Sequence, residues 1–122
     1  MSEAIMRRYY DAYNAEDEDA LAALLAPDVV LRSGQGEIAG RDAYLETYRM
    51  MIGNFVDKMT PDAIATEGEV TTVRIADRLL ARHAVPDFFG RPVQHGEEIL
   101  LALIGRYTIR DGLIRRIELS PA

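Results

Sequence analysis

The sequence predicts a single α+β domain over residues 1–122, in which three N-terminal helices pack on an antiparallel sheet. Apolar residues recur at helical spacing up to about residue 53, and they alternate with polar residues after Pro61. Because the helices come first and the longer strands last, the order indicates an α+β fold and not βαβ alternation. The length of 122 residues suits one domain with one core.

Three segments carry the helical pattern. Residues 2–14 place Tyr9 and Tyr13 on one apolar face, and a serine precedes them as a cap. Residues 17–26 begin with acidic side chains, which favour the positive end of the helix dipole, and end before a proline. Residues 40–53 form the third predicted helix, with an inner stripe of tyrosine, leucine, methionine and isoleucine.

The other segments are predicted strands and turns. An Asp-Gly turn at residues 111–112 joins the last two strands. A tight turn is expected at Ala76-Asp77-Arg78, and a loop with two aromatic side chains at residues 86–92. The predicted strands are residues 28–32, 37–39, 63–75, 79–85, 97–110 and 113–120.

The composition argues against several classes of protein. The chain has no cysteine, which excludes disulfides and thiolate metal sites. Its net charge of −6 argues against a nucleic-acid partner, because a phosphate backbone requires a basic surface. The N-terminus lacks the apolar core of a signal peptide, and no apolar run approaches the roughly 20 residues of a membrane helix. We therefore expect a cytoplasmic protein with neither nucleic acid nor membrane as partner.

The candidate metal and cofactor motifs are weak. His83, His95 and Glu97 could in principle form a two-histidine, one-carboxylate metal set, but no tight ligand spacing supports one. Gly34-Gln35-Gly36 is expected to be a hairpin turn and not a phosphate-binding loop. We expect neither a metal nor an organic cofactor.

Four parts of the chain carry local strings that occur together in one superfamily. They are MRRYYDAYN at residues 6–14; LAPDVV at 25–30 with IAGR at 38–41; ADRLLARHAV at 76–85 with FFGRP at 88–92; and IGRY at 104–107 with DGLI at 111–114. In this order they resemble the nuclear transport factor 2-like superfamily, most closely its ketosteroid isomerases and SnoaL-like polyketide cyclases. The resemblance covers nearly the whole chain.

The resemblance implies a fold and a type of chemistry. The sheet is expected to curl into a cone around the helices and to leave an apolar cavity open at one end. Such proteins are commonly homodimers through the outer face of the sheet. Their usual chemistry is proton transfer next to a carbonyl, or water addition, without metal or organic cofactor.

The acids that the resemblance would supply are missing at their usual positions. Tyr9 matches the tyrosine that ketosteroid isomerases carry on their first helix. The position of their aspartate base holds Ser33, which cannot abstract a carbon-bound proton unless another base activates it. A further acid, which donates a hydrogen bond to the developing oxyanion, is replaced by Leu103. The resemblance therefore implies a pocket without implying the isomerase mechanism.

Strand alternation nominates replacements for these acids. His83 is predicted to point inward and to face Tyr9 across the cavity, as a pair in which Tyr9 polarises an oxygen and His83 moves a proton. A histidine that only shapes the pocket is the alternative. The other predicted pocket residues are Tyr13, Ser33, Met51, Phe55, Val85, Phe88, His95, Glu97, Leu101, Leu103, Ile117 and Leu119.

Two functions fit these patterns. One is a cofactor-independent enzyme that isomerises, cyclises or dehydrates a small apolar carbonyl compound. The other is a non-catalytic ligand-binding or dimerisation domain of the same fold. Leu100, Ala102 and Ile104 form an apolar row on the predicted outer sheet face, which favours a homodimer.

Overall fold

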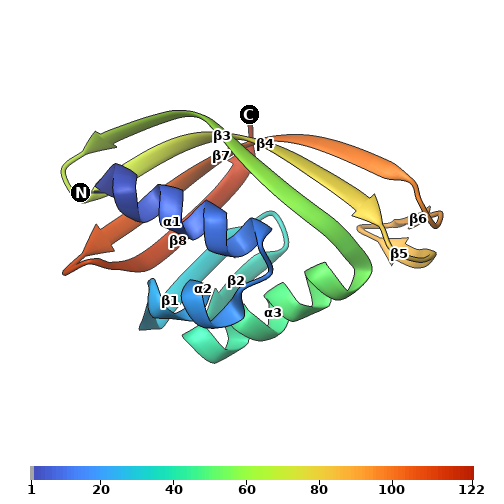
Figure 1. The fold of residues 1–122 in the computed structure, drawn as a ribbon, viewed down its shortest axis with the longest axis horizontal. Coiled ribbons are helices and arrows are strands. Elements are labelled where there is room, and N and C mark those ends of the chain that lie inside the picture. Colours follow the sequence, from blue (N-terminus) through green and yellow to red (C-terminus); the bar gives the residue numbers. More distant parts are fainter. Residues whose placement is uncertain (1) are drawn as a thin grey trace.

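The computed structural model describes residues 2–122, which form three helices and two sheets (Figure 1). The helices are α1 (Ser2–Asn14), α2 (Glu18–Ala23) and α3 (Arg41–Asn54). The strands are β1 (Leu25–Ser33), β2 (Gly36–Ala39), β3 (Phe55–Glu67), β4 (Val70–Ala81), β5 (Val85–Phe88), β6 (Arg91–Val93), β7 (Glu98–Arg110) and β8 (Leu113–Pro121). The predicted α+β class and the three helices are confirmed.

The main sheet has six strands in the order β2-β1-β8-β7-β4-β3, and it is mixed. All neighbouring strands are antiparallel except β1 and β8, which run parallel. The prediction of a wholly antiparallel sheet is therefore wrong at this pair. A parallel pair needs a long connection, and α3 together with β3 to β7 supplies one between β1 and β8.

The sheet arches over the helices, which all lie on its concave side (Figure 1). Alternation along the long strands sends one set of side chains inward. Val73 and Ile75 of β4 and Ile117 of β8 are almost completely buried there, against Met6 of α1 and Leu21 of α2. The second sheet, β5 with β6, is a separate small hairpin at one end of the molecule (Figure 1).

The hairpin of β3 and β4 differs from the sequence prediction. Residues 76–78 lie in the middle of β4, and the chain reverses instead at Gly68, whose φ of +62° suits glycine. β3 also begins at Phe55, directly after α3, eight residues before the predicted start at Ala63. The polar triplet suggested a turn, but Asp77 is a buried residue on the inner face of a continuous strand.

Other boundaries differ less. The predicted second helix, residues 17–26, ends at Ala23, because Leu25 already belongs to β1. The predicted strand over residues 79–85 ends at Ala81, and the predicted loop over residues 86–92 lies within the β5–β6 hairpin. The Asp111-Gly112 turn is confirmed, with positive φ at both residues.

All six tyrosines of the chain are buried between the helices and the sheet. Tyr10 donates a hydrogen bond to Tyr107 at 2.8 Å, and Tyr9 shares one with Tyr44. Tyr48 donates to the backbone oxygen of Tyr13 at 2.8 Å. Each tyrosine hydroxyl therefore takes part in at least one hydrogen bond, so these large rings fill the core while their polar ends find partners.

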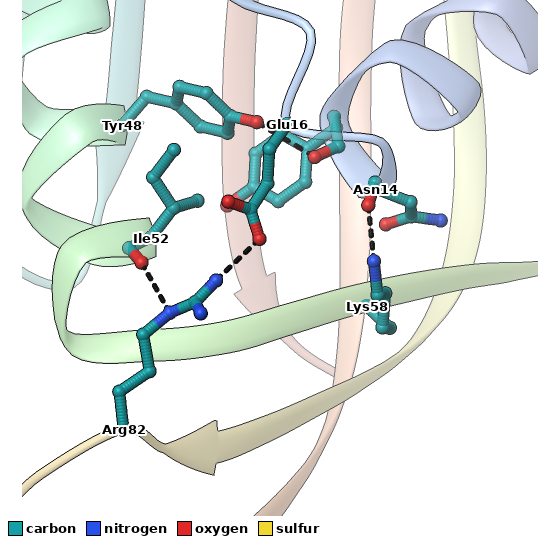
Figure 2. Close-up of polar contacts among 7 residues, drawn as sticks. Asn14, Glu16, Tyr48, Ile52, Lys58 and Arg82 are labelled. Atoms are coloured by element: carbon teal, nitrogen blue, oxygen red, sulfur yellow. Dashed lines mark hydrogen bonds and ion pairs between the residues drawn. The ribbon is translucent and has the colours of Figure 1, made fainter.

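Arg82, just after β4, joins the ends of two helices (Figure 2). Its Nε donates to the backbone oxygen of Ile52 in α3 at 2.8 Å, and its Nη2 lies 2.5 Å from a carboxylate oxygen of Glu16, which follows α1. Beside it, the Lys58 ammonium of β3 donates to the backbone oxygen of Asn14. Arg82 therefore lies beyond the strand and reaches the helices.

No helix within residues 2–122 combines the length and the apolar character that a bilayer crossing requires.

We predict that Gly105→Ala destabilises the fold. A Cβ atom at Gly105 would lie 2.7 Å from Cε1 of Tyr107, whose buried ring is fixed by the hydrogen bond from Tyr10. Overpacking of this kind typically costs about 1–3 kcal/mol. Urea denaturation measures the difference in the free energy of unfolding. Gly53→Ala in α3 is the matched control, because its Cβ meets nothing within 4 Å and it should leave stability unchanged or slightly raised.

Candidate active site

A cavity of about 640 Å³ lies between the concave face of the sheet and helices α1 and α3. Its wall is mainly apolar and aromatic, with a few hydroxyl, amide and carboxyl groups. The predicted pocket residues that lie in this wall are Tyr9, Tyr13, Ser33, Met51, Phe55, Val85, Phe88, Leu101, Leu103 and Leu119. Most of the predicted pocket residues therefore lie in the wall, but they form only part of it.

His83 does not lie in this wall, so its predicted pairing with Tyr9 is wrong. β4 ends at Ala81, and His83 follows in an exposed bend where strand alternation no longer applies. Its Nδ1 lies 2.9 Å from the backbone oxygen of Ala84. Tyr9, in contrast, is buried, and its hydroxyl is already bonded to Tyr44.

Three further predicted residues lie outside the cavity wall. His95 is exposed in the turn before β7, beside Gly96 with a φ of +81°. Glu97 precedes β7 and accepts the Gln94 backbone N–H at 3.0 Å, which with the Arg91 guanidinium lowers the pKa of the Glu97 carboxyl. Ile117 is fully buried in the main core.

Ser33 and Leu103, at the positions of the missing acids, do line the cavity. The Ser33 Oγ accepts the backbone N–H of Gln35 at 3.2 Å and so belongs to the β1–β2 turn. Neither residue is an acid, and no base lies within hydrogen-bond distance of Ser33 among the contacts that the structure describes. The reactive groups of this cavity have to be sought elsewhere.

Two buried aspartates, Asp57 of β3 and Asp77 of β4, lie in the cavity wall. In the ladder between these strands Asp57 pairs with Leu79, and Asp77 pairs with Met59, so the two aspartates are diagonal neighbours on the inner face. Asp57 is 2% exposed and Asp77 is 5% exposed. The fold therefore holds two carboxyl groups together, away from water.

Burial decides the charge of this pair. Desolvation, reinforced by the neighbouring Asp57 carboxyl, raises the pKa of the Asp77 carboxyl to about 9. At neutral pH Asp77 therefore keeps its proton, and the pair carries one negative charge. The hydrogen bond of 2.7 Å that the Asp57 Oδ2 accepts from the Tyr13 hydroxyl would stabilise this charge on Asp57.

Tyr13 remains a neutral donor in this arrangement. Burial, reinforced by the Asp57 charge, raises the pKa of Tyr13 well above its ordinary value of 10.0. Tyr13 itself is held by Tyr48, whose ring centroid lies 4.8 Å from its own. The site thus offers a carboxylate, a carboxylic acid and an oriented hydroxyl side by side, which is an acid–base set.

The sequence contained a signal for this pair that the turn prediction concealed. Val73, Ile75, Asp77, Leu79 and Ala81 alternate with outward-facing residues, so the acid stands at an inward position of a continuous apolar pattern. Three residues after α3, Asp57 likewise stands between inward Phe55 and Met59. A polar residue in the inward register of a strand is the observation that nominates both aspartates.

Aromatic side chains narrow the open side of the cavity. Phe88 and Phe89 of the β5–β6 hairpin lie with ring centroids 4.4 Å apart, and Phe88 lies 4.8 Å from Phe55. Phe89 and Met50 line the cavity and are 59% and 66% exposed, which places them at its opening. Asp87 accepts the Gly90 backbone N–H at 2.8 Å and stabilises the hairpin turn.

A family model described as a SnoaL-like domain matches residues 6–117. The chain belongs to the SnoaL-like domain family. This match spans most of the chain, and it confirms the resemblance that the local sequence strings indicated. A search of curated protein sequences finds no match to this chain.

Solved structures share this SnoaL-like fold. One, from Xanthomonas campestris pv. campestris and assigned as a polyketide cyclase, is 24% identical with a TM-score of 0.86, covering 98% of this chain and 89% of that one. A second structure, from Sinorhizobium meliloti, is also assigned as a polyketide cyclase. It is 27% identical with a TM-score of 0.74, and the match covers 95% of this chain and 93% of that one. An epoxide hydrolase from M. tuberculosis is 18% identical with a TM-score of 0.79, and the match covers 98% of this chain and 80% of that one. These likenesses establish the fold.

We predict that Asp77 makes folding stability fall with rising pH. Its folded pKa of about 9 exceeds the ordinary 3.8, so the folded state holds a proton that the unfolded state releases. The unfolded state releases this proton above about pH 4, so Asp77 destabilises the folded state increasingly as the pH rises from there toward the folded pKa. Urea denaturation from pH 5 to 8.5 should show this slope in the wild type and not in Asp77→Asn.

Asp62→Asn is the matched control for this measurement, because Asp62 is an exposed carboxylate at the irregularity in β3. It should retain the wild-type slope. Parallel pH profiles for the wild type and Asp77→Asn would show that Asp77 is ionised in the folded protein.

Proposed function

We propose that this SnoaL-like protein is a cofactor-independent enzyme that catalyses proton transfer on a small, mostly apolar carbonyl compound. The reaction would be an isomerisation, a cyclisation or a dehydration. The observation that supports this proposal is the buried pair Asp57 and Asp77 in the wall of a largely apolar cavity. Carboxyl groups whose environments separate their proton affinities are typical of acid–base catalysis.

The roles of the two acids follow from their protonation. The Asp57 carboxylate would take a proton from the carbon next to the substrate carbonyl. The neutral Asp77 would donate its hydrogen bond, or its proton, to the carbonyl oxygen as negative charge develops there. The proton on Asp57 then returns to a different atom of the substrate or to the same one, and any proton that Asp77 gave to the oxygen returns to Asp77 as the carbonyl re-forms, so that the enzyme is unchanged.

The surroundings favour these roles. Tyr13 holds the Asp57 carboxylate by its hydrogen bond of 2.7 Å, and thereby fixes the direction in which the free oxygen points. Apolar residues around the pair, such as Leu79 and Leu101, exclude water and strengthen electrostatic interactions. Two structural neighbours, one assigned as a polyketide cyclase and one named as an epoxide hydrolase, act on small molecules according to their names. They support a small-molecule substrate for this chain.

The alternative is a non-catalytic ligand-binding or dimerisation domain with the same fold. The same cavity would serve it, and the aspartates would then only shape and polarise the wall. The two functions differ in one measurable property, which is whether the protein accelerates exchange of a carbon-bound proton.

We predict that the wild type accelerates deuterium incorporation at the α-carbon of 2-tetralone in D₂O near neutral pH, followed by proton NMR. Asp57→Asn should lose about 10²- to 10⁴-fold of this acceleration, because the amide cannot accept the proton. Asp62→Asn, with its exposed side chain, should retain the wild-type rate. Equal rates for the wild type and Asp57→Asn, or no acceleration over buffer, would favour the binding domain.

We propose that the partner of this chain is a second copy, bound through the outer face of the main sheet. Leu100 of β7 is 69% exposed there, and Ala102 and Ala76 are exposed beside it as a cross-strand pair. Ile104 and Leu80 extend the same face and are half-buried. An apolar face on an open sheet is stabilised when another surface covers it.

The dimer has a direct test. Sedimentation equilibrium at micromolar concentration should give a dimer for the wild type and a monomer for Leu100→Lys, because the lysine would place a charge inside the interface. Glu46→Lys, an exposed position on the helical side, should remain dimeric. A wild-type monomer would refute the proposal.

A further inference from the structure

The ionisable side chains in the cavity wall are carboxyls and tyrosines. Asp57 and Asp77 lie deep in the cavity, and Asp87 lies at its opening. Among residues 2–122, no lysine, arginine or histidine belongs to this wall. Lys58 and Arg78, next to the two aspartates in sequence, are exposed on the opposite sheet face, because strand alternation sends them outward. The cavity therefore disfavours an anionic ligand and favours a cationic one.

Aromatic rings border the carboxyl pair on both sides. Tyr13 donates to Asp57 and lies 4.8 Å from Tyr48, centroid to centroid. On the other side Phe55, two residues before Asp57 on the same strand face, lies 4.8 Å from Phe88. The faces of such rings attract ammonium groups. A cation beside Asp57 would thus find both a negative charge and aromatic neighbours.

The carboxyl pair also has unused hydrogen-bonding capacity. The Oδ1 atoms of Asp57 and Asp77 are buried and, within the described chain, have no hydrogen-bond partner. A shared proton can link the two groups by a single bond. A primary ammonium group carries three N–H donors and could serve both carboxyls at once.

We propose that this cavity binds a small arylalkyl primary amine as its ammonium ion, which replaces the proton shared by Asp57 and Asp77. The ammonium group would donate to both carboxylates, and the aryl ring would lie among the aromatic side chains. The proposal uses the same carboxyl pair as the proposed function, but it does not require that the pair be catalytic.

Binding in this way releases a proton. The free site holds one proton and one negative charge, because burial beside Asp57 raises the pKa of Asp77. The bound ammonium ion faces two carboxylates, so one proton passes to the buffer for each amine bound. The other titratable groups that line the cavity are Asp87 and the tyrosines of α1, α3 and β7, namely Tyr9, Tyr13, Tyr44, Tyr48 and Tyr107.

These other groups do not supply the proton near neutral pH. Burial raises the pKa of Tyr9, Tyr13, Tyr44 and Tyr107 far above their ordinary value, and raises the pKa of the Tyr48 hydroxyl to about 12. Asp87 is exposed at the opening, and its Oδ1 is bonded within the hairpin turn. The proton count therefore reports on the carboxyl pair.

Isothermal titration calorimetry tests the proposal with benzylamine, benzyl alcohol and benzoate, three probes of similar shape and different charge. At pH 7.5 benzylamine should bind at least about 10-fold more tightly than benzyl alcohol, and benzoate should bind most weakly. Titrations in phosphate and in HEPES, whose heats of ionisation differ and which carry no primary ammonium group, should show release of about one proton per benzylamine bound.

Variants locate the effect. Asp77→Asn should bind benzylamine at least about 10-fold more weakly and release no proton, whereas Asp62→Asn should match the wild type. Benzyl alcohol or benzoate binding as tightly as benzylamine to the wild type would overturn the proposal, whether or not the variants fold. Deuterium exchange into 2-tetralone without amine is measured separately, so that loss of amine selectivity and loss of catalysis are distinguished.

Discussion

Two carboxyl groups buried side by side cannot both be ionised at low free-energy cost, and this constraint organises the candidate site. Asp57 and Asp77 share one charge because β3 and β4 bring them together in the buried wall of the cavity. Tyr13 stabilises the charged member, and Tyr48 positions Tyr13. The helices therefore contribute to the chemistry of the site and also cover it, since without them both carboxyl groups would be exposed to solvent and would have ordinary pKa values.

The buried tyrosines fill the space around this carboxyl pair. A sheet curved over helices leaves a deep space, and rings with polar ends can fill it while presenting hydroxyls to one another. Tyr10 with Tyr107 and Tyr9 with Tyr44 close such pairs across elements far apart in the sequence. Arg82 also links the residues after α1 to the end of α3 through its hydrogen bonds. The cavity is what remains between these fixed points.

Local patterns predicted the fold class and ten residues of the cavity wall, because helix spacing and strand alternation are set by nearby residues. They missed the parallel pairing of β1 with β8, which depends on contacts between the two ends of the chain. They also missed the reactive pair. The Ala76-Asp77-Arg78 triplet has turn-forming composition, and only the tertiary pairing of β4 with both β3 and β7 keeps it extended. Because a turn was predicted at residues 76–78, the next strand was predicted over residues 79–85 and so included His83, whereas β4 ends at Ala81.

The passage from α3 into β3 has a consequence for how this chain tolerates change in length. No loop separates Asn54 from Phe55, and Asp57 lies only three residues beyond the helix. A single inserted or deleted residue here would reverse the inward and outward faces of the strand start and expose the carboxylate. The turn at Gly68 is free of this restriction, because it lies at the far end of the hairpin. The chain should therefore tolerate an inserted residue at the Gly68 end of β3 far better than at its Phe55 end.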